Sequence, residues 1–372
     1  MKVGMLTSVG DRCGIATYSE DLAVGLRSLV DLDIVPVWDQ ASPWEVYRTQ
    51  AADHLNAADV VHVQHEYSFW GSVLPRRNKF FDQISSIRRP IVMTAHTLNP
   101  VGQVLGLDLP GSVFRKTAKR ILAAYPPYRR TIEIETFKVA DRIIIHDSFA
   151  RERLVSRGIP ESSIRIIPMG VPAADPTPGQ GEAFRRKFGL EGRTLLTVFG
   201  FVRPGRGYEA ALDALSMLDR PATLVMAGAP QIPRHEVYLD ALMAEVKSRG
   251  LSDQALVTGY LTGEGVAGLM QASDIILCPQ EFGTGSYSVL VALPYGRPII
   301  ASDLPFFAAL GEDDCLLTFK TGDAQDLAAR INSVLGNQAL REELSNGAVA
   351  YAREHTWHKI AEKTVKVYQE LL

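Results

Sequence analysis

Short apolar runs alternate with longer amphipathic segments along almost the whole chain. The runs are rich in Val, Ile and Leu and too short for helices, so we predict that they form buried strands. Strands separated by helical segments are typical of βαβ units on parallel sheets. The predicted strands are residues 2–6, 33–37, 59–64, 90–96, 142–147 and 164–170, followed by 194–200, 222–228, 255–260, 274–279, 298–302 and 315–319.

The alternation is interrupted once, by the Pro-, Gly- and Ala-rich stretch "GVPAADPTPGQG" at residues 170–181. A chain of 372 residues is long for one domain and comfortable for two. We therefore predict an α/β protein with two Rossmann-like, doubly wound parallel-sheet domains, residues 1–170 and 171–355, facing a cleft. The apolar spacing of residues 356–372 predicts a C-terminal helix, and its return to the first domain is left open. Ligands of such sheets bind beyond the carboxyl ends of the strands.

Composition and charge narrow the class of protein. A net charge of -3 and 46% hydrophobic residues argue against a nucleic-acid binder and against a disordered chain. Cys13, Cys278 and Cys315 stand far apart, which argues against a disulfide framework and a thiolate zinc site. No apolar run reaches the roughly 18 residues of a membrane span, and the first one is too short for a signal peptide. We expect a cytoplasmic protein.

Residues 278–300, "CPQEFGTGSYSVLVALPYGRPII", predict a strand, a turn rich in Gly and Ser, and a helix that ends at a glycine. Ser286 or Thr284 would cap the helix, and Gly283 and Gly285 would let the backbone approach a ligand. Backbone N–H groups at a helix N-terminus favour an anion such as a phosphate or diphosphate. A plain turn whose glycines only reverse the chain is the alternative.

A second positive feature follows the first predicted strand of the second domain. Arg203 and Arg206, in "FGFVRPGRGYEAALDAL", fall on the loop at the carboxyl edge of the same sheet. Guanidinium groups there could neutralise a departing diphosphate, whereas a solvated basic loop is the alternative. After the first strand of the chain, Gly10 and Gly14 make no GxGxxG fingerprint, so only a glycine turn that opens a helix is predicted.

The segment "QHE", residues 64–66, ends another strand of the first domain. A lone His–Glu pair is not a metal site, because it lacks a third ligand and the HExxH spacing. His65, Glu66 and Tyr67 are candidates for substrate contact or acid–base assistance, and a hydrogen-bonded structural pair is the alternative. The aromatic residues up to Trp70 could line a bound ligand or pack in the core.

The basic segment "FRKTAKRILAAYPPYRR", residues 114–130, carries interleaved apolar side chains. It could make a peripheral contact with the inner face of an anionic membrane. A solvated helix face is the alternative.

In their order and spacing these segments resemble the GT-B glycosyltransferases, specifically the large retaining family 4 that uses nucleotide-sugar donors. The resemblance covers nearly the whole chain. It rests on motifs that include "RCGIATYSEDLA", "HVQHEYSFWG", "PIVMTAHTL", "RPGRGYEAALDAL" and "GSYSVLVALPYGRPIIASD".

The resemblance implies roles for matching positions. Arg206 takes the place of the family's basic residue, usually Lys, that binds the donor diphosphate, and Arg203 resembles a second cation. His96 resembles the family histidine that contacts the transferred sugar, and Gly14 the first-domain backbone contact to the donor phosphates. The implied start of the diphosphate-binding helix comprises Gly285, Ser286, Tyr287 and Ser288.

One departure from the family pattern concerns the residues that would hold the donor. The family usually carries two glutamates eight positions apart around this helix, and Gly283 and Val291 stand at those positions. Glu281 is the only carboxylate nearby in the sequence, so we predict that it contacts the sugar or ribose from a shifted position. Another group holding the ribose is the alternative.

The prediction is a metal-independent hexosyltransferase of polysaccharide biosynthesis. As the resemblance implies, it would move a hexose, with retention, from a UDP- or GDP-sugar to a hydroxyl of a glycan, lipid-linked or small-molecule acceptor. His65, Glu66 and Tyr67 are the candidate acceptor contacts, and the aromatic residues up to Trp70 could line a sugar ring. Residues 114–130 could touch a lipid-linked acceptor.

No DxD pair stands on a predicted cleft loop, so no metal or other cofactor is expected. Arg203, Arg206 and helix amides would stabilise the departing diphosphate instead. A GT-B epimerase or phosphorylase, or a non-catalytic sugar-nucleotide-binding protein, are the alternatives.

Overall fold

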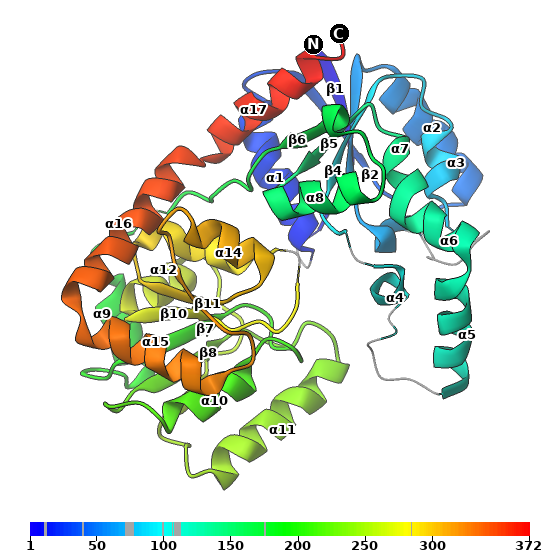
Figure 1. The fold of residues 1–372 in the computed structure, drawn as a ribbon. Coiled ribbons are helices and arrows are strands. Elements are labelled where there is room, and N and C mark those ends of the chain that lie inside the picture. The colour runs from blue at the N-terminus through cyan, green and yellow to red at the C-terminus, as the bar shows by residue number, and fades with distance from the viewer. Residues whose placement is uncertain are drawn as a thin grey trace. The chain divides into compact units, whose positions relative to one another are not determined.

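A computed structural model describes residues 1–10, 13–38, 41–70, 78–98, 100–105, 107, 113–174, 176–283 and 285–372. The chain divides into two compact units, residues 1–170 with 357–372 (unit 1) and residues 171–356 (unit 2). Each unit is built on a six-stranded sheet with helices on both faces (Figure 1). Every predicted strand is present, and the predicted α/β fold of two doubly wound parallel sheets is confirmed.

The sheet of unit 1 has the strand order β2-β1-β3-β4-β5-β6, and all of its strands are parallel. The chain passes from β1 to β2 on one side and returns to β3 on the other. Loops that follow β1 and β3 therefore flank a topological switch point, where open parallel sheets bind ligands. The strands are β1 Lys2–Thr7, β2 Asp31–Pro36, β3 Val60–His65, β4 Ile91–Ala95, β5 Arg142–Ile145 and β6 Ile164–Ile166.

Helices bury both faces of this sheet. All six residues of β3 are buried, as expected for a central strand covered on both sides. Leu55 and Ile84 pack with Val61 and Val63 of β3 in one apolar cluster, and each such side chain contributes about 1.5–3 kcal/mol by leaving water. The helical segments of unit 1 are α1 Gly14–Leu26, α2 Trp44–Asn56, η1 Tyr67–Trp70, α3 Phe80–Ile84, α4 Val101–Val104, α5 Val113–Ala124, α6 Pro126–Arg130, η2 Thr131–Glu135, α7 Thr136–Lys138, α8 Ser148–Ser156, η3 Glu161–Ser163 and α17 Trp357–Gln369.

The C-terminal helix α17 belongs to unit 1, where it packs on α1 (Figure 1). A Cβ added at Gly25 of α1 would lie 2.7 Å from the Trp357 carbonyl oxygen, so glycine permits this close packing. The buried Tyr368 hydroxyl lies 2.6 Å from Nδ1 of His62 on β3. Helix α17 is thus fixed to the sheet by a buried polar contact as well as by apolar packing.

The sheet of unit 2 has the order β12-β11-β10-β7-β8-β9 and is also parallel. Its switch point lies between β7 and β10, because β8 and β9 extend the sheet on one side of β7 and β10 to β12 on the other. The strands are β7 Leu195–Phe199, β8 Thr223–Ala227, β9 Ala255–Val257, β10 Ile275–Cys278, β11 Ile299–Ser302 and β12 Leu317–Phe319.

The core of unit 2 joins its central strands to the covering helices. Val198 of β7 and Leu277 of β10 share one apolar cluster with Leu212 and Ile331 from helices.

No helix among the described residues combines the length and the apolar character that a bilayer span requires. The helical segments are α9 Gln180–Phe188, α10 Tyr208–Leu215, α11 Arg234–Ser248, α12 Gly263–Ala272, α13 Tyr287–Ala292, η4 Leu293–Tyr295, α14 Pro305–Gly311, α15 Ala324–Gly336 and α16 Gln338–Glu354.

An ion-paired cluster ties the end of α17 to two strands of unit 1. The Glu370 carboxylate accepts hydrogen bonds from Arg165 Nη2 at 2.6 Å and from Arg142 Nε at 2.7 Å. The hydrogen bond from Arg165 has the largest effect, followed by that from Arg142, and together they lower the pKa of Glu370 to about 2. A lowered folded-state pKa means that the stabilisation is present above the unfolded-state pKa and is lost as the pH falls.

We predict that Glu370→Gln lowers the melting temperature at pH 7 and that its difference from the wild type shrinks as the pH falls below about 4.5. Differential scanning calorimetry of the full chain between pH 7 and pH 3 measures this. Glu362→Gln is the control, since its carboxylate lies on the same helix, 3.6 Å from His358. An equal loss for both variants, or a difference that does not vary with pH, would show that the Glu370 cluster adds nothing.

Candidate functional site

Two loops meet at the switch point of unit 2: residues 200–207 after β7 and residues 279–283 after β10. The Glu281 backbone N–H donates to the Gly205 carbonyl oxygen at 3.1 Å. Gly207 has a φ of +81°, and a Cβ added there would lie 1.8 Å from the Pro279 carbonyl oxygen. Only glycine allows both this backbone conformation and this approach. The two predicted anion-binding loops are therefore in direct contact.

Arg206 is a buried cation at this junction, with 8% of its surface exposed. Its Nη2 donates to Ser288 Oγ at 2.7 Å and to the Phe199 carbonyl oxygen. Within the described ranges, no carboxylate lies within ion-pair distance of this guanidinium. A buried charge that is not paired is costly. An anionic ligand would supply the partner that the chain does not.

Arg203 brings a second guanidinium to the same loop. It lies 5.8 Å from the centre of the Phe282 ring, and Nη1 donates to the Pro204 carbonyl oxygen at 3.3 Å. Burial and then the neighbouring Arg206 lower the pKa of Arg203, which nevertheless stays charged at neutral pH. Two like charges at one sheet edge create a positive potential that favours a multivalent anion.

The start of α13 differs from the sequence prediction. Ser286 occupies the N-cap position, but its side chain makes no capping hydrogen bond. Its Oγ instead lies 3.2 Å from the Nε2 of the buried Gln280, which needs an acceptor. The predicted Ser286 cap is therefore wrong, and Thr284 lies outside the described residues. Because α13 has only six residues before the chain tightens into η4, the guanidinium groups are the stronger anion-binding feature here.

The remaining residues of this loop bear on the missing glutamate pair. Glu281 is exposed, and so is Gly283, which has a φ of +151°. Val291 is half-buried on α13. Gly285 is exposed, whereas Tyr287 and Ser288 are half-buried in the first turn of that helix. The sequence positions of the family's two glutamates thus carry no carboxylate, and the predicted role of Glu281 stays a prediction.

In unit 1, His96 follows β4 at the carboxyl edge of the sheet. Its Nε2 lies 2.8 Å from Gln64 Oε1, and the Tyr18 ring meets it edge-on with centroids 4.7 Å apart. Burial lowers the pKa of His96 well below its usual value, and the electrostatic effect of the neighbouring His146 lowers it further. His96 is therefore neutral, and an N–H at Nε2 donates to the amide oxygen of Gln64.

A buried chain of hydrogen bonds continues from Gln64. Its Nε2 lies 3.2 Å from Nε2 of His62, which also lies 2.8 Å from Thr94 Oγ1. An amide nitrogen only donates, so His62 Nε2 accepts and Nδ1 carries the proton toward the Tyr368 hydroxyl. Burial lowers the pKa of His62 to about 3, so this ring stays neutral. The Tyr368 hydroxyl of helix α17 thus helps to fix the orientation of His62, and the bonds through Gln64 extend this to His96.

The sequence interpretation missed His62 and Tyr368. The signal for His62 was present, because His62 and Gln64 are polar residues two apart in an apolar strand and so share one face. Tyr368 lies 306 positions from His62, and nothing in the sequence pairs the two.

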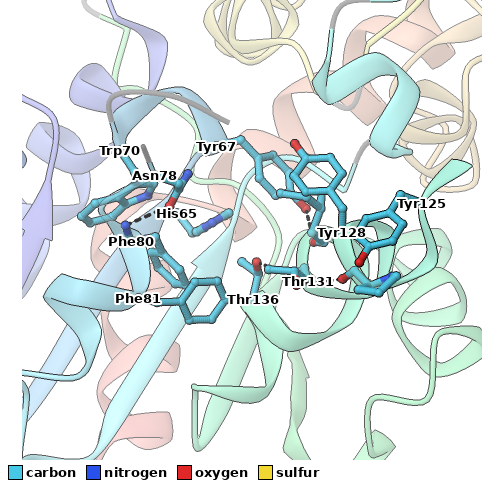
Figure 2. A pocket seen from close by; sticks show the side chains of 12 residues that line it. His65, Tyr67, Trp70, Asn78, Phe80, Phe81, Tyr125, Tyr128, Thr131 and Thr136 are labelled. Atoms are coloured by element: carbon cyan, nitrogen blue, oxygen red, sulfur yellow. Dashed lines mark hydrogen bonds between the residues drawn. The ribbon is translucent and has the colours of Figure 1, made fainter. Parts of the chain in front are cut away.

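The three predicted acceptor residues have different surroundings. The Glu66 carboxylate accepts from the Tyr67 N–H at 2.9 Å and from the Thr97 hydroxyl, and burial raises its pKa. No hydrogen bond joins the described side chains of His65 and Glu66, so the alternative of a bonded pair is wrong. His65 and Tyr67 instead line a pocket of about 320 Å³ (Figure 2).

Gly14 is exposed and begins α1, as the predicted glycine turn requires. Cys13, Cys278 and Cys315 are free thiols. The described residues contain no cluster of three or more His, Cys, Asp or Glu side chains placed to hold a metal ion. Metal independence stays a prediction.

Comparisons with known proteins place the chain in a family. Residues 180–351 match the family model "Glycosyl transferases group 1", and residues 34–175 match "Glycosyltransferase Family 4". The mannosylfructose-phosphate synthase of Agrobacterium fabrum is 23% identical over 251 residues, which are 64% of this chain and 54% of that protein. The D-inositol 3-phosphate glycosyltransferase of Jonesia denitrificans is 25% identical over 87% of this chain and 74% of its own length.

Solved structures with the same fold include Anabaena HepE in complex with UDP, with a TM-score of 0.77, 15% identity and 100% of both chains covered. Sucrose-phosphate synthase from Thermosynechococcus elongatus has a TM-score of 0.72 and 16% identity, with 100% of this chain and 98% of that chain covered. The two family models follow each other along the chain and together account for most of it. The chain belongs to the family 4 glycosyltransferases and has the GT-B fold.

Proposed function

We propose that this protein transfers a sugar from a nucleotide diphosphate sugar to an acceptor hydroxyl. The observation that carries the proposal is the buried Arg206 guanidinium, which contacts only neutral oxygens among the described residues. Together with Arg203 it offers two positive charges at the switch point of unit 2, the place where sheets of this kind bind nucleotides.

The donor proposal follows from the charges. The diphosphate would accept hydrogen bonds from Arg206 and Arg203, and backbone N–H groups of residues 285–288 would complete the site. Uridine is the base we favour, because Anabaena HepE was solved with UDP and with UDP-glucose. A thermal-shift screen of UDP, GDP and their sugars decides this point, since a ligand that binds the folded chain raises its melting temperature.

The proposed reaction retains the configuration of the sugar. As the bond from the anomeric carbon to the phosphate oxygen breaks, both of its electrons go to the diphosphate, where Arg206 and Arg203 stabilise the charge. The acceptor oxygen bonds to the anomeric carbon on the same face, and its proton passes to the departing phosphate. His96, held neutral, would contact the transferred sugar. No enzyme nucleophile takes part in this scheme.

A second candidate is a sugar-nucleotide-binding protein without transfer activity. It is favoured by Gly283 and Val291, which stand where the family usually carries glutamates. Release of free sugar from a bound donor in the absence of acceptor would support the enzyme, because water then serves as the acceptor.

The hexose, the class of acceptor, the compartment and the membrane contact stay predictions. The segment proposed for membrane contact forms α5 and α6, on which Arg120 and the apolar Ile121 are both exposed. An exposed apolar side chain beside a cation suits an anionic membrane surface.

We predict that Arg206→Ala raises the dissociation constant of the preferred nucleoside diphosphate at least tenfold, or about 1.4 kcal/mol, because a charge-assisted contact is lost. Isothermal titration calorimetry measures this, and Arg206→Lys should retain part of the affinity. Arg249→Ala is the control, since Arg249 pairs with Asp213 and Glu245 in the same unit. Equal affinities for the wild type and Arg206→Ala would refute the assigned role.

The contact between the two loops of unit 2 gives another prediction. Gly207→Ala should destabilise the protein and weaken nucleotide binding, because the new methyl group would collide with the Pro279 carbonyl. Gly250→Ala is a matched control: its φ is +71°, but a Cβ there meets nothing within 4 Å. It should cost only the left-handed strain of about 1–2 kcal/mol and leave binding unchanged. Urea unfolding measures the stability of each variant, and calorimetry measures its nucleotide affinity. Equal losses in the two variants would contradict this geometry.

We predict that His96→Ala lowers the turnover number at least tenfold while changing nucleotide affinity less than threefold, because a contact to the sugar serves transfer and not nucleotide binding. Steady-state kinetics and calorimetry separate the two effects. Gln64→Leu, which leaves the imidazole without its acceptor, should also lower turnover. Normal turnover in His96→Ala would remove this residue from the site.

A further inference from the structure

The pocket in unit 1 is lined mainly by side chains that carry rings. It has a volume of about 320 Å³, near the lower end of ligand pockets. Figure 2 shows the His65 imidazole between the Trp70 and Phe80 rings on one side and the Tyr67 and Tyr128 rings on the other. These side chains come from the end of β3, η1, α3 and α6. Such walls suit an apolar, ring-sized group.

The exposed fraction of the lining side chains rises from the floor of the pocket to its mouth. His65 and Trp70 are each 1% exposed, whereas Phe81 is 37% and Tyr125 56% exposed. His65 packs against Tyr67 and Phe80 at centroid distances of 4.9 Å and 5.0 Å. A ligand would therefore enter past Phe81 and Tyr125 and reach His65 and Trp70 at the bottom.

Two polar atoms of the floor lack partners. His65 Nδ1 and Trp70 Nε1 are buried and make no hydrogen bond with any described residue. Leaving a buried polar group unpaired is costly, so such groups often mark a site of bound water or ligand. Trp70 Nε1 is a donor, and the neutral His65 ring, whose pKa burial lowers to about 3, can donate or accept.

Four further polar groups of the wall are occupied. Asn78 Oδ1 accepts from the Phe80 N–H, and the Tyr67 hydroxyl donates to the Ile132 carbonyl. The hydroxyls of Thr131 and Thr136 donate to the Pro127 and Thr131 carbonyls, each at 2.9 Å. A sugar ring carries many hydroxyls, whereas most of this wall is apolar ring surface. The predicted sugar wall is thus better suited to an apolar group.

The wall also includes an unusual helical turn. Residues Thr131–Glu135 form a π-helix, and Thr131 and Ile132 from it line the pocket. Single π-turns interrupt regular helices at a cost and are frequent at functional sites. None of the described lining side chains is Asp, Glu, Lys or Arg, so a charged ligand would find no counter-ion.

We propose that this pocket binds an uncharged ring-bearing molecule with one hydroxyl or carbonyl group, which pairs with Trp70 Nε1 or His65 Nδ1. The site is independent of the diphosphate site proposed above. Binding to it requires neither a nucleotide nor catalysis.

The first test uses N-phenyl-1-naphthylamine, an uncharged fluorescent ring compound, with the full chain. We expect saturable binding of one probe per chain, and Tyr125→Ala at the mouth should raise the dissociation constant at least fivefold. Tyr260→Ala is the matched control, because Tyr260 is a 63% exposed tyrosine in unit 2. Absence of saturable binding, or equal effects of the two variants, would overturn the proposal.

The second test addresses the polar floor and the shape of the ligand. 1-Naphthol should displace the probe at least threefold more effectively than naphthalene, and Trp70→Phe, which keeps a ring but loses the N–H, should reduce this advantage. Circular dichroism confirms that the variant is folded. Equal displacement by naphthol and naphthalene in the wild type would refute the hydrogen bond. Displacement by 1-decanol as strong as by 1-naphthol would refute the ring preference and indicate a chain-binding site.

Discussion

The burial of Arg206 without a carboxylate partner among the described residues is the constraint on which the proposed donor site of unit 2 depends. Removing a guanidinium from water costs several kcal/mol, and the two neutral acceptors, Ser288 Oγ and the Phe199 carbonyl, each return about 1.5–3 kcal/mol. Arg203, of the same charge, adds repulsion. The chain therefore holds a local excess of positive charge that a diphosphate would offset, and the glycine contact at Gly207 keeps the loops in this arrangement.

Unit 1 solves the problem of buried polar groups in the opposite way. His62, His65 and His96 are all neutral, because burial lowers each pKa. In the row of hydrogen bonds from His96 through Gln64 to His62, each bond has one donor and one acceptor, and the Tyr368 hydroxyl is the last member. A satisfied network of this kind fixes one orientation of each ring. It also explains why α17, which is last in the sequence, belongs to the first unit.

The sequence predicted the fold well because its strands are buried on both faces, which makes them continuous runs of β-branched residues that periodicity detects. It also placed both arginines on the loop between β7 and α10, where the structure has them. Local rules failed where a tertiary partner competed, as at Ser286, whose hydroxyl bonds to Gln280 and not to the helix amides. The π-turn at Thr131–Glu135 has no composition signal that would distinguish it from an ordinary helix.

His65 and Glu66 show why adjacent polar residues cannot be assigned one role from spacing alone. Successive side chains at the end of a strand point to opposite faces, so the two residues enter different environments. Glu66 turns to local N–H and hydroxyl donors, whereas His65 enters an aromatic pocket with Nδ1 unpaired. One face therefore stabilises a turn, and the other leaves an unmet hydrogen-bonding group in an uncharged cavity. The two proposed sites would thus use different chemistry: guanidinium groups in unit 2, and rings with single polar atoms in unit 1.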